Sequence, residues 1–349
     1  MHRGDAVGRH TLRLRDATRA RGFESHIYVD VVEDDTRDET LPVVHYAASA
    51  QPGDVVVYQF ATASFMAPWL AERAETLVVN YHNITPPDLM APWDNHLALG
   101  QVRAQADLRL LVPRTTLAIA DSAYNETHLV AAGFASTAVV PPSADLGVDL
   151  VAHDEGAPRS GRGARWLVVG RVSPNKAIQH TIAALAVTRA HSDPEATLLI
   201  IGKPATSSYD DALHRYVAEL GLTGAVTFGG HASDETVVAA YESSDVLVVT
   251  SEHEGFCVPV VEAMAIGLPV VAFDQGALPE VLGDAGTFVD SVDPYSLAST
   301  ISTLLADASR KGVLSAAARR RLSQLDLPAA AGRFVDLLEG LVVSGAASG

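Results

Sequence analysis

Short runs of β-branched and aliphatic residues alternate with amphipathic stretches along nearly the whole chain. This alternation is typical of strand–helix–strand units, whose parallel strands need a crossover connection. It occurs in two series, separated by a polar, Gly-rich stretch at 153–163 that is typical of a linker. We therefore expect an α/β protein with two Rossmann-like, doubly wound parallel-sheet domains at 1–150 and 165–325. A linker at 151–164 joins them, and a C-terminal helix and tail occupy 326–349.

The strands that we expect are short and mostly aliphatic. Those of the first series lie at Ser25–Asp30, Asp54–Tyr58, Thr76–Tyr81, Leu117–Ala120 and Ala138–Val140. Those of the second series lie at Arg165–Val169, Ala196–Ile201, Ala225–Phe228, Val246–Val249, Pro269–Ala272 and Thr287–Val289. The tail from 310 to 343 has a helical period. Because open parallel sheets bind ligands outside the carboxyl ends of their strands, we expect the two domains to face a shared central cleft there.

The beginning of the chain is unusual for a doubly wound domain. Such a domain opens with a buried central strand, whereas only Met1–Arg3 precede Gly4-Asp5 and a predicted helix at Val7–Arg21. We expect that the first strand either lies upstream of Met1 or is missing, and we favour an upstream start. The predicted helix carries arginines opposite an apolar stripe, a pattern typical of a solvated face; it would also suit peripheral contact with an anionic acceptor or a lipid headgroup.

Charge and composition exclude several classes of protein. The 349 residues carry 25 Lys and Arg against 42 Asp and Glu, a net charge of −17, which argues against a nucleic-acid partner. The single cysteine, Cys257, cannot form an internal disulfide or a cysteine-based zinc site. The longest apolar runs fall far short of the roughly 20 residues of a membrane helix, and the start lacks a signal-peptide pattern. We expect a cytoplasmic protein with no transmembrane segment.

Two cationic residues follow the first strand of the second series. Gly170 and Arg171 come directly after the strand, and Lys176 lies five residues beyond Arg171. Ser173 is a good N-cap and Pro174 suits the first helical position, so the two cations would flank a helix N-terminus, whose N–H groups favour an anion. This arrangement predicts a clamp for a diphosphate.

A second strand-to-helix segment carries two glutamates. Glu254 lies in the predicted loop after Val246–Val249, and Glu262 lies in the first turns of a helix that Pro259 is placed to open. Both carboxylates could then face one bound molecule and accept its hydroxyl groups, as a ribose or a hexose requires. The N–H groups between them would face the phosphates of that molecule; they belong to Gly255, Phe256, Cys257 and Val258.

Taken together, these segments resemble glycosyltransferase family 4, whose members are retaining enzymes of the GT-B architecture. The resemblance rests on Glu254-x7-Glu262, on Gly170-Arg171-x4-Lys176, and on the stretch from Gly267 through Pro279-Glu280-Val281 to Gly286, which occur in the order and spacing of that family. It covers nearly the whole second domain. The sequence is similar to the family less tightly in the first domain.

The resemblance implies roles for residues of the second domain. Arg171 and Lys176 would hold the donor diphosphate and neutralise it as it leaves. Glu262 would bind the ribose hydroxyls, and Glu254 would lie beside the donor sugar. His231, in a loop after the third strand of this series, would be a neighbour of the nucleotide base.

In the first domain, the resemblance points to His82 and to the start of the chain. His82 follows a predicted strand, in a segment similar to the one whose histidine contacts the donor sugar in the family. Gly4-Asp5 resembles the first glycine-rich loop, which lies against the donor phosphate and the acceptor. Cys257 is a departure, because the family often has glycine there; we expect a small buried residue rather than a thiolate nucleophile.

These features predict a metal-independent, retaining hexosyltransferase. No Asp-x-Asp element ends a strand, so we expect no metal and no other cofactor, and a leaving diphosphate stabilised by Arg171, Lys176 and helix N-termini. The co-substrate would be a UDP- or GDP-sugar, and the acceptor a glycan, a lipid-linked sugar or a small molecule. Two alternatives stay open, a sugar-nucleotide 2-epimerase on the same fold and a non-catalytic sugar-nucleotide-binding subunit. A nicotinamide oxidoreductase is disfavoured, because no Gly-x-Gly-x-x-Gly follows a strand.

Overall fold

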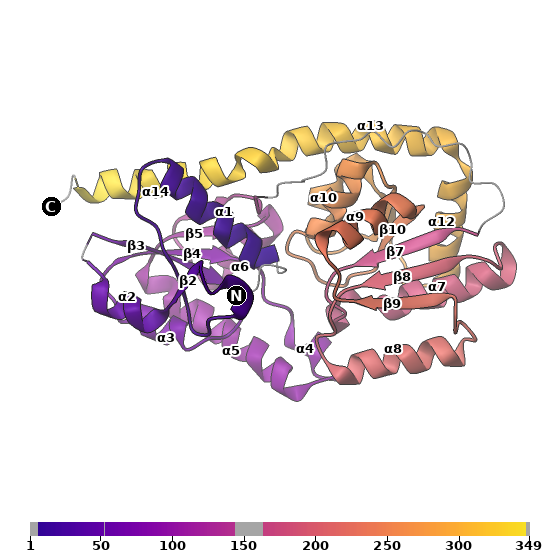
Figure 1. Cartoon of the computed structure of the whole chain (residues 1–349), viewed down its shortest axis with the longest axis horizontal. Coiled ribbons are helices and arrows are strands. Elements are labelled where there is room, and N and C mark those ends of the chain that lie inside the picture. Colours follow the sequence, from indigo (N-terminus) through magenta and orange to yellow (C-terminus); the bar gives the residue numbers. More distant parts are fainter. Residues whose placement is uncertain (1–5, 52, 144–162, 347–349) are drawn as a thin grey trace. The chain divides into compact units, whose positions relative to one another are not determined.

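The computed structural model describes residues 6–51, 53–143 and 163–346 (Figure 1). Contacts within the chain divide it into two compact units. The first unit comprises residues 1–84, 100–145 and 326–349, and the second comprises residues 85–99 and 146–325.

The first unit contains a four-stranded parallel sheet in the order β3-β4-β5-β6. Its strands are β3 (Val55–Phe60), β4 (Thr76–Tyr81), β5 (Thr115–Ala120) and β6 (Thr137–Val139). Its helices are α1 (Ala6–Ala20), α2 (Val43–Ser49), α3 (Met66–Ala71), most of α5 (Asn95–Leu111), α6 (Ala123–Ala132) and α14 (Leu327–Ala346), with 3₁₀ turns η1 (Asp34–Thr36) and η2 (Val112–Arg114). The inner strands β4 and β5 are largely buried, which explains why they read as aliphatic runs without polar alternation.

Helices cover both faces of this sheet. On one face, α1 and α14 lie side by side (Figure 1). Leu14 and Phe334 from these helices pack against Val78 and Ile119 of the strands. On the other face, a second cluster forms around Phe60 with side chains from α3, α5 and α6. The sheet is thus a buried layer between two layers of helix, and the carboxyl ends of its strands carry polar side chains.

The expected strand at Ser25–Asp30 does not join this sheet. Only β1 (Ile27–Val29) forms there, and it pairs in parallel with β2 (Thr40–Pro42) in a separate two-stranded sheet. The expectation that it would extend the main sheet is therefore wrong within the described residues. The apolar run is only three residues long, and the segment after it leads to β2, which supplies its parallel partner in place of the main sheet.

The second unit is built on a six-stranded parallel sheet in the order β12-β11-β10-β7-β8-β9. Its strands are β7 (Arg165–Val169), β8 (Thr197–Ile201), β9 (Val226–Gly230), β10 (Val246–Val249), β11 (Val270–Phe273) and β12 (Thr287–Val289). Its helices are α4 (Pro87–Met90), α7 (Ile178–His191), α8 (Ser207–Glu219), α9 (Asp234–Ser243), α10 (Val258–Ile266), α11 (Leu278–Leu282), α12 (Pro294–Ala306) and α13 (Ala308–Leu325), with 3₁₀ turns η3 (Pro174–Lys176) and η4 (Gly283–Ala285).

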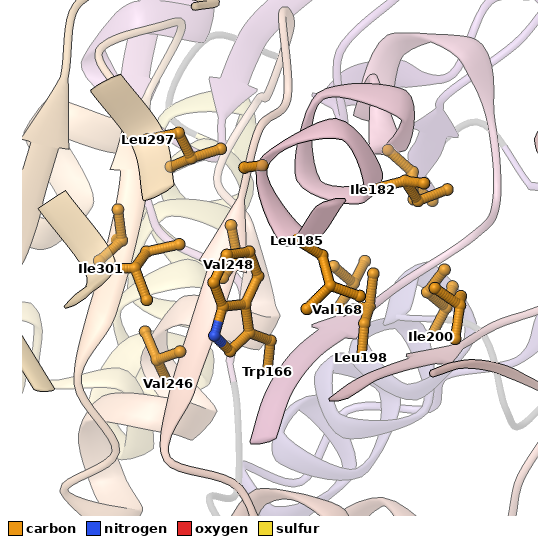
Figure 2. Close-up of a cluster of buried hydrophobic side chains, with 14 of the residues drawn as sticks. Trp166, Val168, Ile182, Leu185, Leu198, Ile200, Val246, Val248, Leu297 and Ile301 are labelled. Atoms are coloured by element: carbon orange, nitrogen blue, oxygen red, sulfur yellow. The ribbon is translucent and has the colours of Figure 1, made fainter. Parts of the chain in front are cut away.

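The core of the second unit lies between the sheet and the helices α7 and α12. Figure 2 shows Trp166 at its centre, beside Val248 of β10, with Leu185 of α7 and Leu297 and Ile301 of α12 packed around it. Trp166 and Leu185 are almost fully buried. On the opposite face, α9 packs on β7 and α10 packs on β11. This two-sided burial holds the carboxyl ends of the strands rigidly in place.

The helical tail is two helices rather than one. α13 ends at Leu325 and α14 begins at Leu327, and Asp326 between them has a positive φ of 45°. The break occurs where Pro328 removes a backbone donor and restricts the preceding residue. α13 packs against α10 in the second unit, whereas α14 packs against α1 in the first. No helix within the described residues is both long and apolar enough to cross a membrane.

Candidate functional site

The strand order of the second unit predicts where a ligand would bind. The chain runs from β7 to β8 and β9 on one side, and then places β10 on the other side of β7. The carboxyl ends of β7 and β10 therefore flank the point at which the strand order reverses, which is where open parallel sheets bind ligands. The two loops that follow these strands, 170–177 and 250–257, carry the residues that the sequence indicated.

Two glycines make the loop after β7 possible. Gly170 has a φ of 132°, and Gly202, directly after β8, has a φ of 155°. A Cβ on Gly202 would lie 1.9 Å from the carbonyl oxygen of Gly170, so the backbone can pass there only without a side chain. The stem of Lys176 lies over Gly170, 3.7 Å from where its Cβ would be. The sequence analysis missed Gly202, although a glycine ending a strand beside a functional loop is a usable signal.

The turn that carries Lys176 differs from the expectation. Ser173 and Pro174 were expected to open an α-helix, but Pro174–Lys176 form a 3₁₀ turn, and α7 begins only at Ile178. The Ser173 hydroxyl does not cap a helix; it donates to the Oδ1 atom of Asn175 instead. Ala177 takes a left-handed conformation with a φ of 47°, which turns the chain sharply after Lys176. Ser173 and Pro174 thus open a single 3₁₀ turn, separate from α7, and the predicted side-chain cap does not form.

Residues of the loop after β10 hold this turn in place. The Thr250 hydroxyl lies 3.1 Å from the carbonyl oxygen of Ala177 and 3.0 Å from the Thr181 hydroxyl. Asn175 donates from Nδ2 to the carbonyl oxygen of His253 at 3.1 Å, and accepts the N–H of Glu252 on its own carbonyl at 2.9 Å. The loops after β7 and β10 are thus joined directly, so their functional side chains are fixed relative to each other.

An ion pair between Lys176 and Glu254 occupies the centre of the site. The Nζ atom of Lys176 donates to Oε1 of Glu254, and the Ser251 hydroxyl donates to the same oxygen at 2.7 Å. The side chain of Glu254 is 8% exposed and that of Lys176 is 20% exposed. Burial opposes the charged form of Lys176, but the Glu254 carboxylate outweighs it, so the pKa of Lys176 lies above its ordinary value. The lysine is therefore a fixed cation at the sheet edge.

The second loop leads into α10 through a strained residue. Cys257 is buried and has a φ of 73°, a conformation that suits glycine better than a residue with a side chain. Pro259 lies in the first turn of α10, as the sequence predicted. Burial raises the pKa of the Cys257 thiol, so it stays protonated at neutral pH. This agrees with the expectation of a small buried residue rather than a nucleophile.

The loop after β11 contacts the backbone of Glu254. Gly276 follows β11 with a φ of 60°, and a Cβ there would lie 2.5 Å from the carbonyl oxygen of Glu254. The N–H of Ala277 donates to that same oxygen at 3.0 Å. The backbone of Glu254 is thus held against the backbone of the β11 loop, a contact that the sequence analysis did not foresee.

Glu262 lies one helix turn inside α10. Its Oε2 atom accepts the Tyr241 hydroxyl at 2.8 Å, and that hydroxyl also lies 3.3 Å from the Pro259 carbonyl oxygen. Tyr241 is buried, so it anchors the carboxylate on the α9 side of the helix. The predicted pair Glu254 and Glu262 therefore sits on one loop–helix segment, but each carboxylate has its own protein partner.

Some of the predicted residues of the second unit line a small hollow. Gly170, Arg171, Lys176, Glu254 and Cys257 line this hollow, together with strand residues and Ser251. Arg171 is exposed, and His231, directly after β9, is exposed too. The remaining predicted backbone donors continue the loop into α10, with Phe256 buried and Gly255 and Val258 half-buried.

A short segment from the first half of the chain also packs near the lysine turn. α4 contacts η3, the 3₁₀ turn that contains Lys176. The Trp93 ring lies against Tyr209 with 4.9 Å between centroids, and the Ser208 hydroxyl donates to the Trp93 carbonyl oxygen at 2.6 Å. Residues 85–99 thus belong to the second unit in space although they precede it in sequence. Sequence analysis gave no sign of this.

His82 lies at the carboxyl end of β4 in the first unit and is held at both ring nitrogens. Its Nδ1 atom lies 2.9 Å from Oδ2 of Asp121, and its Nε2 atom lies 2.6 Å from Oε1 of Gln59. The side chains of His82 and Asp121 are 4% and 7% exposed. His82 was predicted from the sequence, but its partners were not: Asp121 follows β5, and Gln59 is the penultimate residue of β3. Gly4 and Asp5 lie outside the described residues.

The described residues contain no group of three or more His, Cys, Asp or Glu side chains placed to hold a metal ion. The polar groups of the site are instead a lysine, an arginine, two carboxylates and the backbone N–H groups at the start of α10. This set can neutralise a phosphate anion and accept hydroxyl groups.

A family model matches a large part of the second unit. Residues 155–321 match the family model described as "Glycosyl transferases group 1". The segment 155–321 is therefore similar to the glycosyl transferases group 1 family. The family prediction from the Lys176 and Glu254 segments is thereby confirmed, because both segments lie inside the match.

Individual relatives agree with this family. The D-inositol 3-phosphate glycosyltransferase of Salinispora arenicola is 36% identical over 167 residues, covering 46% of this chain and 37% of the relative. The chain thus spans less than half the length of the first curated relatives that it matches, 37% and 42% for two of them.

Solved structures show the fold of the whole chain. Sucrose-phosphate synthase from Thermosynechococcus elongatus superposes with a TM-score of 0.76 at 20% identity, covering 97% of this chain and 94% of that one. The Anabaena protein HepE, solved in complex with UDP-glucose, has a TM-score of 0.74 at 20% identity, with 97% and 98% covered. The predicted fold class, a GT-B protein with two parallel α/β domains, is confirmed.

Proposed function

We propose that this protein transfers a hexose from a nucleoside diphosphate sugar to an acceptor hydroxyl, with retention at the anomeric carbon and without a metal. The observation that carries the proposal is the buried Lys176–Glu254 pair at the strand-order reversal of a glycosyl transferases group 1 segment. HepE, a protein of similar fold, was solved with UDP-glucose, which supports a nucleotide sugar as the donor.

The chemistry needs a stabilised leaving group. As the bond between the anomeric carbon and the diphosphate breaks, negative charge builds on the phosphate oxygens. Lys176 and Arg171 would neutralise it, together with the N–H groups at the start of α10. Since Glu254 keeps Lys176 charged and in place before the donor arrives, little reorganisation is needed, and such preorganised groups commonly contribute several kcal/mol.

Retention follows if the acceptor attacks from the face that the diphosphate leaves. The acceptor oxygen bonds to the anomeric carbon, the carbon–oxygen bond to the diphosphate breaks, and the acceptor proton passes to a phosphate oxygen. No protein nucleophile is needed, in line with the protonated, buried thiol of Cys257. Glu262 would accept the ribose hydroxyls and Glu254 would lie beside the sugar.

A thermal melt with nucleotides tests the donor site without knowledge of the acceptor. UDP, GDP and ADP are added separately, because a ligand at about 100 times its Kd stabilises the native state by about 2.7 kcal/mol. We expect a shift with one nucleotide, reduced in Glu262→Ala and unaffected by EDTA. The absence of any shift from a folded sample contradicts the proposal, and a shift lost on adding EDTA contradicts its metal independence.

Turnover then separates transfer from its alternatives. With the matching donor, release of the nucleoside diphosphate should require an acceptor, and NMR of the product should show the donor's anomeric configuration. Lys176→Ala should lower kcat at least about 100-fold, in the range known for removal of one charge-stabilising group. Formation of an epimeric sugar nucleotide without acceptor indicates the 2-epimerase, and binding without any turnover across acceptors indicates a non-catalytic subunit.

A further inference from the structure

A chain of buried polar side chains crosses the first unit behind His82. It begins at Ser143, runs through His10 of α1 and Asn80 of β4 to Gln59 of β3, and ends at His82 and Asp121. The Asn80 amide nitrogen lies 3.2 Å from Nε2 of His10 and 2.9 Å from Oε1 of Gln59. His10 and Asn80 are almost fully buried, at 2% and 1% exposure. Of these residues, only His82 was predicted from the sequence.

The protonation of His10 follows from a backbone group. The Ser143 N–H donates to Nδ1 of His10 at 3.1 Å. A backbone N–H cannot act as an acceptor, so Nδ1 carries no proton, and a neutral imidazole then carries its proton on Nε2. Burial also lowers the pKa of His10 to about 3, so the ring is neutral at physiological pH. His10 therefore presents an N–H to Asn80.

The Nε2–H group of His10 determines the orientation of the Asn80 and Gln59 amide groups. An amide NH₂ facing the His10 N–H would place two donors together, so the Asn80 oxygen must face His10, an orientation reached by a 180° turn of the amide group. The same oxygen then faces Gln59, so Gln59 must present its NH₂ group to it. That NH₂ group also lies at the 2.6 Å contact with Nε2 of His82 and donates there. His82 is left with one proton, on Nδ1, which it donates to Asp121.

We propose that Gln59, Asn80 and His10 are positioning residues that hold His82 as the neutral Nδ1–H tautomer. The inference rests on the proposed function, in which His82 belongs to the donor-sugar site. With Nδ1 bonded to Asp121 and Nε2 bonded to Gln59, the ring exchanges no proton with the substrate. His82 thus acts through its fixed position, and the acceptor proton passes to the phosphate as derived above.

The competing arrangement is a cationic His82. The titratable groups that face its ring within the described residues are Asp121 from β5 and His10 from α1, whose ring centroid lies 5.6 Å away. A cation would compensate the buried Asp121, whose Oδ1 atom has no hydrogen-bond partner among the described residues. It would, however, need the Gln59 oxygen at Nε2, and would leave two donors facing each other between Asn80 and His10. The backbone N–H of Ser143 excludes that pattern.

Nitrogen NMR of the free protein tests the tautomer directly. With ¹⁵N-labelled histidine, protonated and unprotonated ring nitrogens have distinct chemical shifts, and a His82→Phe sample assigns the signals. At pH 7 we expect a protonated Nδ1 and an unprotonated Nε2 for His82, and the reverse for His10. Two protonated nitrogens on His82, or a protonated Nε2 alone, would overturn the proposal whatever the variants do.

Two substitutions of Gln59 separate positioning from packing. Gln59→Glu replaces the donor by an acceptor of the same shape, so His82 should gain a proton on Nε2. Gln59→Met keeps the volume but offers neither donor nor charge, so His82 should stay neutral. We expect kcat to fall at least about 10-fold further in Gln59→Glu than in Gln59→Met. An unchanged His82 signal in folded Gln59→Glu contradicts the inference; if that variant does not fold, the wild-type spectrum decides alone.

The tautomer and the proposed function are tested by separate measurements, so either can fail without the other. The NMR measurement needs neither donor nor acceptor, whereas the nucleotide melt tests the second unit and does not involve His82. A correct tautomer without nucleotide binding would refute the proposed transferase and leave the network intact. Normal turnover with a cationic His82 would refute the network and leave the transferase intact.

Discussion

Gly276 provides a sensitive test of how the β11 loop positions Glu254. At its φ of 60°, an alanine Cβ would lie 2.5 Å from the Glu254 carbonyl oxygen and 2.9 Å from the Glu254 nitrogen. Real Cβ contacts start near 3.0 Å, so the Glu254 backbone must move by at least about 0.5 Å. Since a misplacement of about 1 Å can cost about 100-fold in rate, we expect Gly276→Ala to lower kcat on the order of 10-fold.

A matched glycine separates this displacement from the general cost of positive φ. Gly221 has a φ of 68°, and a Cβ there would meet nothing within 4 Å. Both alanines should lose about 1 kcal/mol from the left-handed conformation, or about 2–4 °C in Tm for a unit of this size. Only Gly276→Ala should also lower kcat and weaken the thermal shift with nucleotide. Turnover within twofold of Gly221→Ala would refute the reasoning that the β11 loop positions Glu254.

Four further predictions concern ionisation, strain and thiol reactivity. The Glu254 carboxylate raises the pKa of Lys176 above 10.5. The ion pair therefore stabilises the fold fully below about pH 10.5, and this stabilisation is lost as the pH rises through the raised pKa. In a Tm series from pH 8 to 11, Glu254→Gln should begin to lose stability at a lower pH than the unsubstituted protein. His10 has a pKa of about 3 in the folded protein, so the free energy of unfolding should fall by about 1.4 kcal/mol per pH unit as the pH drops from 6.5 toward 3. Urea unfolding at several pH values should show a shallower dependence of this free energy on pH in His10→Gln. Cys257→Gly should be more stable than Cys257→Ala by about 1 kcal/mol in a thermal melt, because only glycine accepts a φ of 73° without strain, and equal Tm values would contradict this. The Cys257 thiol itself should react slowly with iodoacetamide at pH 8, because burial raises its pKa.

The local pattern of the chain determined the elements and much of the second-unit site. Short aliphatic runs set β7 and β10 at the residues expected, because strands that are buried on both faces consist of aliphatic residues. The spacing of Arg171, Lys176, Glu254 and Glu262 placed these residues near one sheet edge, because loops after parallel strands emerge on the same side. The error at Ser173 has a local cause: a serine and a proline suit a 3₁₀ turn as well as an α-helix, and the left-handed Ala177 decides between them.

Tertiary structure decided which partner each of these side chains has. Lys176 and Glu254 are 78 residues apart, and their ion pair depends on β10 lying beside β7, which no local pattern specifies. The same holds for Gly202 and Gly276, whose close backbone contacts arise only when neighbouring strands are paired. In the first unit the sequence indicated His82, but a histidine's proton is set by what surrounds it. Ser143 and His10 are 133 residues apart, and a backbone N–H brought to His10 by the fold is what orders the protons along the chain to His82.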